Sequence, residues 1–250
     1  MGKKSNNKAL EKKAEKKAEK ERKNAAVANV KLANSVKDPL DILPKPFSVY
    51  NKNGLDLVLE TVRAPDMDEA TLSWAFEQVK TNMKPLYDEV YKSCQELDWE
   101  DKKEEMREDL AWYLLVRNQE GAPVAFSHFR YDLDYGDEVL YCYQIQVQLE
   151  YRRKGLGKFM MKVLEMLMIK ADMLKIMCTI FKNDISQFEF FVTTLKFEVD
   201  ETSFMDTVDE QSEFKILSRF NQIKKRKMQE EGIFQPKVKP SCCTSVSSCC

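Results

Sequence analysis

The sequence contains a single histidine, His128, among its 250 residues. This scarcity excludes catalysis that rests on several histidines and argues against a metal site built from histidine ligands. No apolar run approaches the roughly 20 residues that a membrane-spanning helix requires, and the charged N-terminus lacks the apolar stretch of a secretory signal. We therefore expect neither a transmembrane segment nor a resident metal ion.

Cysteine is also used sparsely along most of the chain. Three of the seven cysteines are scattered, and four lie in the last nine residues. Without a secretory signal, the thiols are expected to meet a reducing compartment, where disulfides are rare. The tail group has no flanking histidine and matches no familiar zinc spacing, so we expect a tail without a metal. Its members are Cys242, Cys243, Cys249 and Cys250.

Charge is distributed unevenly along the chain. The stretch 3–23 holds ten basic and four acidic residues, whereas the whole chain has a formal charge of −1. An alanine-, glutamate- and lysine-rich segment of this kind predicts an exposed, marginal helix. Two interpretations stay open, a solubilising arm or an electrostatic tether to a ribosome or to chromatin. We predict a basic, partly helical or disordered arm at 1–37, a folded domain at 38–220, and a disordered basic tail at 221–250.

Apolar periodicity predicts the elements of the folded part. Helical spacing runs from Asp68 to about Tyr87, from Gly157 to about 171, and over 185–195. Strand-like runs occupy 111–117, 123–131, 138–147, 174–181 and 214–217. Three antiparallel strands followed by helix, strand, helix and strand indicate one α+β domain.

The segment Arg152–Lys158 reads R-R-K-G-L-G-K and lies between a predicted strand and a predicted helix. Glycines let the backbone turn tightly, and successive N–H groups at a helix N-terminus bind phosphate oxygens. The basic side chains add charge for further phosphates. The phosphate loop of ATPases and the dinucleotide fingerprint of dehydrogenases are both absent from the sequence. We therefore predict a coenzyme pyrophosphate site, with a turn that merely shapes the start of the helix as the alternative.

The pattern Arg-x-x-Gly-x-Gly after a strand resembles the coenzyme A loop of the GCN5-related N-acetyltransferases. Further stretches resemble, in order, the N-terminal acetyltransferase D family, which acetylates the N-terminal serine of histone four and histone two-A. The resemblance extends over about 38–219 and implies a mixed, mostly antiparallel sheet flanked by helices, acetyl-CoA as acetyl donor, and a nuclear and cytoplasmic enzyme. The stretches are Trp74–Met83 (W-A-F-E-Q-V-K-T-N-M), Ala111–Tyr113, Pro123–Tyr131 (P-V-A-F-S-H-F-R-Y), Gly136–Tyr143 (G-D-E-V-L-Y-C-Y) and Ile216–Arg219.

The resemblance also implies roles for individual residues. The implied coenzyme-binding residues are Ile145, Gln146, Val147, Arg153, Lys154, Gly155, Leu156, Gly157, Lys158, Asn183 and Asp184. The implied substrate-binding residues are Tyr87, Asp132, Tyr141, Tyr143, Thr179 and Phe214, and the implied catalytic residues are Asp132, Tyr143 and Gln144. Backbone groups of 145–147 would hold the pantetheine arm, and 153–158 the pyrophosphate.

The chain departs from the family pattern at several of these positions. Gln144 stands where the family has glutamate, and an amide cannot usefully accept a proton, so Asp132 becomes the leading base, acting through water. Phe214 replaces a substrate-binding tyrosine, and Asp184 replaces a coenzyme-binding asparagine. Phe191 stands where many relatives in the wider superfamily have a tyrosine that protonates the thiolate.

Amine chemistry favours one substrate class. An α-amine has a pKa of about 7.7–8.0 against about 10.4 for lysine, so roughly a tenth or more of an α-amine is neutral near pH 7. A modest base therefore suffices for an α-amine but not for lysine. We predict a monomeric α-amine acetyltransferase whose acidic loops around Asp134 and Asp200 attract histone tails. A lysine acetyltransferase and a catalytically impaired protein that binds acetyl-CoA and histone tails remain the alternatives.

Overall fold

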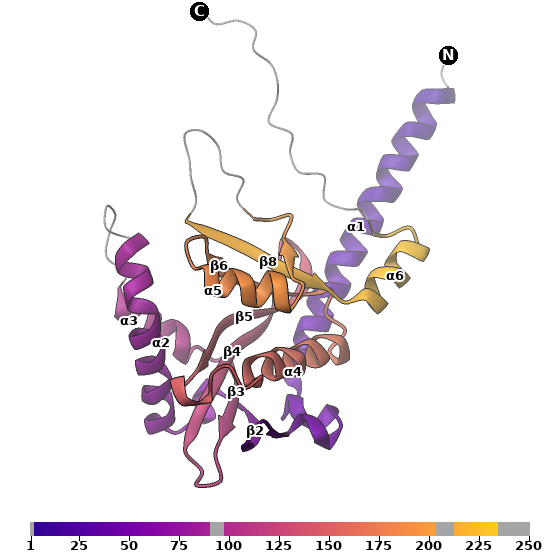
Figure 1. Ribbon diagram of the computed structural model, residues 1–250. Coiled ribbons are helices and arrows are strands. Elements are labelled where there is room, and N and C mark those ends of the chain that lie inside the picture. The colour runs from indigo at the N-terminus through magenta and orange to yellow at the C-terminus, as the bar shows by residue number, and fades with distance from the viewer. Residues whose placement is uncertain (1–2, 91–97, 204–212, 235–250) are drawn as a thin grey trace, which may run out of the picture.

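The computed structural model describes residues 3–90, 98–203 and 213–234 (Figure 1). The tail cysteines and Cys94 lie outside these residues, as do Asp206, Asp209 and Glu210 of the predicted acidic loop around Asp200. The strands are β1 (Val49–Lys52), β2 (Leu55–Arg63), β3 (Trp112–Arg117), β4 (Pro123–Asp134), β5 (Asp137–Val147), β6 (Lys175–Phe181), β7 (Glu198–Val199) and β8 (Phe214–Phe220). The α-helices are α1 (Lys3–Ser35), α2 (Glu69–Val90), α3 (Trp99–Arg107), α4 (Leu156–Lys170), α5 (Ile185–Phe188) and α6 (Gln222–Glu230).

The described strands form one sheet in the order β1-β2-β3-β4-β5-β6-β8-β7. Every neighbouring pair is antiparallel except β5 and β6, which run parallel with α4 as their crossover. The predicted α+β class with a mixed, mostly antiparallel sheet is confirmed. Within the described residues, no helix combines the length and the apolar character needed to cross a membrane.

Alternating side chains of the central strands supply two cores, one on each face of the sheet. On β3, Trp112 and Leu114 pack with apolar residues of α4, whereas Tyr113 and Leu115 pack with residues of α2 and α3. Successive side chains of a strand point to opposite faces, so a strand buried on both sides is apolar throughout. Helix α4 and the second half of α1 therefore cover one face, and α2 and α3 cover the other (Figure 1).

The second half of α1 contacts the hairpin of β4 and β5. Ala26 and Ala33 are almost fully buried, and the Asn34 side chain donates a hydrogen bond of 2.9 Å to the Tyr131 carbonyl. The first half projects away from the sheet (Figure 1). Sequence periodicity alone gave no sign of this docking, since small alanines at the contact carry little apolar signal. The division of the chain into an arm, a domain and a tail stays a prediction.

Helix α6 lies in a segment for which the sequence predicts disorder. Asn221 caps it by accepting a hydrogen bond from the Lys224 backbone N–H. The Lys224 ammonium reaches the carboxylates of Glu138 and Asp172. Expected disorder over 222–230 is therefore wrong, because a cap and the buried ion pair of Lys224 with Glu138 stabilise a helix that has little apolar surface.

Candidate active site

A cavity of about 1020 Å³ opens where β5 and β6 separate. The two strands pair only between Val139–Cys142 and Lys175–Cys178, although β5 continues to Val147 and β6 to Phe181. Beyond Cys142 the edge of β5 that faces β6 has no strand of the described part of the chain beside it. Backbone N–H and C=O groups on such an edge are available to an extended ligand. The geometry thus offers a slot for a linear, amide-containing molecule.

One end of the cavity is closed by the loop that enters α4. Gly155 is the N-cap residue, with φ of 85° and no side-chain cap. The first N–H groups of a helix have no partner inside the helix, and here no side chain caps them from the N-cap position. Gly155, Leu156, Gly157 and Lys158 all line the cavity. These N–H groups and the helix dipole therefore suit a phosphate at this end.

Strand β1 and the turn that follows it hold this loop in place. The Tyr50 hydroxyl donates a hydrogen bond of 2.6 Å to the Lys154 carbonyl, and the Asn53 amide donates one of 2.9 Å to the same oxygen. A Cβ on Gly155 would lie 2.8 Å from the Tyr50 hydroxyl oxygen. Glycine is thus required here both by its left-handed backbone and by the close approach of Tyr50.

A β-bulge shapes the middle of the cavity. The pairing of β4 with β5 shifts between His128 and Phe129, which leaves Tyr143 as the extra residue on β5. Both Tyr143 and its neighbour Gln144 then lie toward α2 and α3. Tyr143 stacks on His128, with 5.0 Å between ring centroids, and Gln144 reaches the side chain of Gln146. A bulge that re-aims side chains beside a cavity is a common feature of functional sites.

His128 is buried between two tyrosine rings. It stacks on Tyr113 on one side and on Tyr143 on the other. Burial lowers its pKa well below the ordinary value, and the charges of Arg130 and Lys102 act in the same direction. Its Nε2 accepts a hydrogen bond from Arg130, whose guanidinium also lies 4.6 Å from the Tyr143 ring centroid. His128 is therefore a neutral support for Tyr143 and has no exposed face to act as a base.

Aromatic rings enclose the far end of the cavity. Tyr87 of α2 packs edge-on against Phe181 of β6, with 5.1 Å between centroids, and Phe181 in turn contacts Phe214 of β8. The hydroxyls of Tyr141 and Thr179 are 2.6 Å apart across β5 and β6. This end can therefore bind a small polar group against hydroxyls within an aromatic wall.

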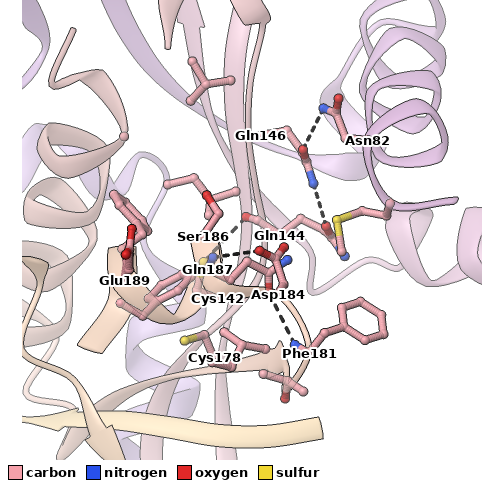
Figure 2. Close-up of a pocket in the computed structure, with 18 of the residues that line it drawn as sticks. Asn82, Cys142, Gln144, Gln146, Cys178, Phe181, Asp184, Ser186, Gln187 and Glu189 are labelled. Carbon is pink, nitrogen blue, oxygen red and sulfur yellow. Dashed lines mark hydrogen bonds between the residues drawn. The ribbon is translucent and has the colours of Figure 1, made fainter. Parts of the chain in front are cut away.

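Side-chain amides line the opposite wall (Figure 2). Asn82 of α2 donates a hydrogen bond of 2.9 Å to Gln146 Oε1, and Gln146 Nε2 donates one of 3.2 Å to Gln144 Oε1. Asn82 Oδ1 accepts a hydrogen bond of 3.0 Å from Arg152 in the loop before α4. Sequence reasoning missed Asn82, because no local pattern connects a residue on α2 with one on β5.

Most of the residues implied by the resemblance meet at this cavity. Those that line it are Tyr87, Tyr141, Tyr143, Gln144, Ile145, Gln146, Val147, Arg153, Gly155, Leu156, Gly157, Lys158, Thr179, Asp184 and Phe214. Three implied residues are not among the lining residues: Asp132, Lys154 and Asn183. Asp184 lines the cavity but its carboxylate caps α5, accepting a hydrogen bond from the Gln187 N–H. Phe191, at the position of the superfamily's thiolate acid, is buried at the cavity wall.

Asp132 lies on the exposed end of β4. Its carboxylate accepts a hydrogen bond of 2.7 Å from the neighbouring Leu133 N–H. The pKa of Tyr143 is raised chiefly by burial, and the negative charge of Asp132 acts in the same direction. Any role of Asp132 as a base must therefore be exercised from the rim, across water.

Several carboxylates of the expected acidic rim form ion pairs with basic residues of the same protein. Asp137 pairs with Arg22 of α1, Glu138 with Lys224 of α6, and Asp200 with the buried Lys175. These carboxylates are between 2% and 6% exposed, so they stabilise the fold rather than face solvent. The expectation that they attract a basic tail is wrong for these three residues. Charge counting along the sequence could not reveal their partners, which come from distant segments.

Solved structures of acetyltransferases resemble this one at low sequence identity. A GNAT-family acetyltransferase from Listeria monocytogenes is 14% identical over 69% of this chain and 99% of its own, with a TM-score of 0.48. The PaiA N-acetyltransferase from Thermoplasma acidophilum, in complex with coenzyme A, is 15% identical over 66% and 98%, with a TM-score of 0.47. Ard1 from Thermoplasma volcanium is 12% identical over 65% and 97%, with a TM-score of 0.43.

The sequence model of the acetyltransferase (GNAT) family matches residues 76–196. This segment runs from α2 to the end of the π-helical turn Glu189–Thr194 that follows α5. It contains the bulge, the loop before α4 and every described residue that lines the cavity except Phe214. Members of the family use acetyl-CoA, and the uncapped start of α4 beside an open strand edge fits that molecule. Residues 76–196 are accordingly similar to acetyltransferase domains of the GNAT family.

Proposed function

We propose that the protein transfers the acetyl group of acetyl-CoA to the α-amine of the N-terminal serine of histone four and histone two-A. The observation that carries the α-amine part is the scarcity of carboxylates in the cavity. Among the described lining residues only Asp184 and Glu189 are acidic, and both belong to the α5 side (Figure 2). The amine must therefore arrive neutral or lose its proton to a weak base.

The phenols at the reacting end are proton donors at neutral pH. Burial raises the pKa of Tyr141 to about 12, and burial also raises that of Tyr143. Neither phenol is poised to take a proton from an ammonium group. An α-amine with a pKa of about 7.7–8.0 needs little help, whereas lysine at about 10.4 would need a strong base. This difference supports an α-amine substrate.

The chain's own residues divide the remaining work. Bound acetyl-CoA supplies the activated acetyl group. The open edge of β5 at Ile145 and Val147 can pair with the pantetheine amides, while the N–H groups that begin α4 and the charge of Arg153 and Lys158 hold the pyrophosphate. Tyr141, Thr179 and Tyr87 orient the serine, and Asp132 accepts the amine proton through water at the rim.

The choice of histones rests on the sequence resemblance quoted above, which also implies a nuclear and cytoplasmic enzyme. In the loop between β4 and β5, Asp137 and Glu138 are paired internally and Asp134 lies 3.8 Å from the Lys175 ammonium. Attraction of a basic tail to this loop therefore depends on Asp132. The projecting half of α1, rich in lysine, is the part of the protein suited to a tether on a ribosome or on chromatin.

Two matched peptides test the proposal. Both begin Ser-Gly-Arg-Gly-Lys. One has a free α-amine and an acetylated lysine side chain, and the other has a blocked α-amine and a free lysine side chain. Release of coenzyme A thiol is followed for each at a saturating acetyl-CoA concentration. We expect turnover of the first peptide to exceed that of the second at least a hundredfold, as the neutral fractions of the two amines imply.

The other outcomes identify the alternatives. Faster turnover of the blocked peptide would overturn the α-amine assignment and indicate a lysine acetyltransferase. Turnover of neither peptide, with acetyl-CoA binding measured by calorimetry, would indicate a protein that binds its ligands without transferring acetyl.

A further inference from the structure

A chain of side-chain amides joins the coenzyme loop to the centre of the cavity, and its direction is fixed. Arg152 carries only hydrogen-bond donors, so the Asn82 atom 3.0 Å from it must be the amide oxygen. Asn82 must then offer its nitrogen to Gln146, and Gln146 must receive it on Oε1. Gln146 is left to donate from Nε2 to Gln144 Oε1. A single arginine thus sets the orientation of three amides that are otherwise symmetrical in shape.

This hydrogen-bonded chain fixes the orientation of the Gln144 side-chain amide. Its Oε1 is occupied by Gln146, so its NH2 group, with two donors, is what remains for the cavity that Gln144 lines (Figure 2). Gln144 and Gln146 are 7% and 6% exposed, so rotation of either amide would leave buried donors or acceptors without partners. The chain therefore presents a donor at this point of the wall.

We propose that Gln144 donates a hydrogen bond to a carbonyl oxygen bound in the cavity, and that Asn82 and Gln146 are positioning residues that hold it in this orientation. This inference rests on the proposed function for the identity of the ligands. Two carbonyl oxygens have the required chemistry, that of the acetyl thioester and that of the peptide backbone. Gln146 could equally donate to a carboxylate at position 144, so the hydrogen-bonded chain of amides would tolerate glutamine or glutamate there. Glutamine differs from glutamate only in the group that faces the ligand, which is a donor in place of an acceptor.

Gln146→Glu is the most discriminating substitution, because it reverses the chain without altering Gln144. A carboxylate at position 146 accepts from Asn82 and from Gln144 Nε2, so the Gln144 amide rotates and turns its oxygen toward the cavity. Gln144→Glu places an acceptor there directly, and Gln144→Met removes both polar groups. Gln148→Glu is the matched control, since it adds the same charge two residues further along, at a residue that does not line the cavity.

Kinetics separate the two carbonyl sources. If the thioester carbonyl receives the hydrogen bond, we expect Gln144→Glu, Gln144→Met and Gln146→Glu to lower kcat about a hundredfold with peptide KM nearly unchanged, as for loss of one oxyanion donor. If the peptide carbonyl receives it, peptide KM rises about tenfold in the same three variants. In both cases Gln146→Glu has little further effect in the Gln144→Met background, and Gln148→Glu resembles the wild type.

Two results would overturn the proposal. A higher kcat in Gln144→Glu, growing as the pH falls below 7, would show that position 144 serves as a base and that the amide only weakens it. Equal kinetics in Gln146→Glu and Gln148→Glu would show that the hydrogen-bonded amides do not determine which group Gln144 presents to the cavity. If the wild type turns over no peptide, the proposed function fails, and calorimetric affinities for acetyl-CoA and for the peptide decide this proposal separately. We then expect one affinity to fall about tenfold in the Gln144 variants, and no change in either would overturn it.

Discussion

Alanine in place of Gly155 tests the loop that holds the coenzyme phosphates. Gly155 has φ of 85°, and an added Cβ would lie 2.8 Å from the Tyr50 hydroxyl oxygen. The left-handed conformation costs alanine about 1–2 kcal/mol. Displacing Tyr50 removes its hydrogen bond to the Lys154 carbonyl, worth about 1 kcal/mol. We expect the free energy of unfolding to fall by about 2–3 kcal/mol, the sum of these two costs.

The same substitution should also weaken binding of coenzyme A. The shifted loop no longer aims its N–H groups at one phosphate position, so we expect affinity for coenzyme A to fall about ten- to a hundredfold. Gly121→Ala is the control, because φ there is 80° but an added Cβ meets nothing within 4 Å. It should lose about 1–2 kcal/mol of stability and keep its affinity.

Urea unfolding and calorimetric titration with coenzyme A measure the two quantities. Tyr50→Phe removes the oxygen that collides with the new Cβ, so the double variant of Gly155→Ala and Tyr50→Phe should regain part of the affinity. Equal affinity in Gly155→Ala and Gly121→Ala would refute the reasoning, because the two variants would then share only a backbone cost.

Three further predictions concern the buried charges and the phenols. Lys175→Met leaves Asp200 buried without its ammonium partner at 2.8 Å, and should cost about 3–5 kcal/mol in urea unfolding at pH 7. Burial alone would raise the pKa of Asp200, but hydrogen bonds led by that from Lys175 lower it, so this carboxylate stabilises the wild type above its ordinary pKa. The cost of Lys175→Met should consequently shrink as the pH falls toward 3 and the stranded carboxyl takes up a proton, and a constant difference would contradict the assignment. Burial raises the pKa of Tyr143, so this phenol stays protonated where the substrate amine loses its proton. The rate should therefore rise with pH through about 7.7–8.0, the pKa of the α-amine. Tyr143→Phe should lower kcat without moving that inflection, and a shifted inflection would mean that the phenol titrates. Tyr141→Phe removes the 2.6 Å contact with Thr179 and should raise peptide KM about tenfold while leaving the affinity for coenzyme A unchanged, as titration can check.

The sequence predicted the parts of the fold that depend on local pattern. The runs that became β3, β4 and β5 are long and apolar, and the two glycines at Gly155 and Gly157 mark the entry to α4. Their order along the chain sufficed for the fold class, because short connections between antiparallel strands leave few alternatives.

The hairpin of β1 and β2 was missed although a signal for it exists. Asn53 and Gly54 both have positive φ and connect the two strands, and Asn-Gly between alternating residues is a strong hairpin indication. The omission had a functional cost, because Tyr50 and Asn53, which hold the Lys154 carbonyl, lie in this hairpin.

Other features depend on contacts between distant segments, and no local pattern could reveal them. The bulge at Tyr143 arises from the pairing of β4 with β5, and it decides that Tyr143 and Gln144 lie on one side. Asn82 meets Gln146 across 64 positions. The pairing of Asp137 with Arg22 likewise joins residues 115 positions apart. Asp137, predicted to attract a basic tail, therefore forms a structural ion pair instead.

The most direct test of the α-amine assignment is a competition within one molecule. A peptide that begins Ser-Gly-Arg-Gly-Lys, with both its α-amine and its lysine free, is incubated with acetyl-CoA and the protein, and the acetylated atom is mapped by fragment mass spectrometry at early times. We predict that acetate appears on the serine α-amine and is undetectable on lysine. Acetate on lysine, or on both amines at comparable rates, would contradict the account of a cavity whose tyrosines are protonated and whose proposed base, Asp132, acts through water from the rim.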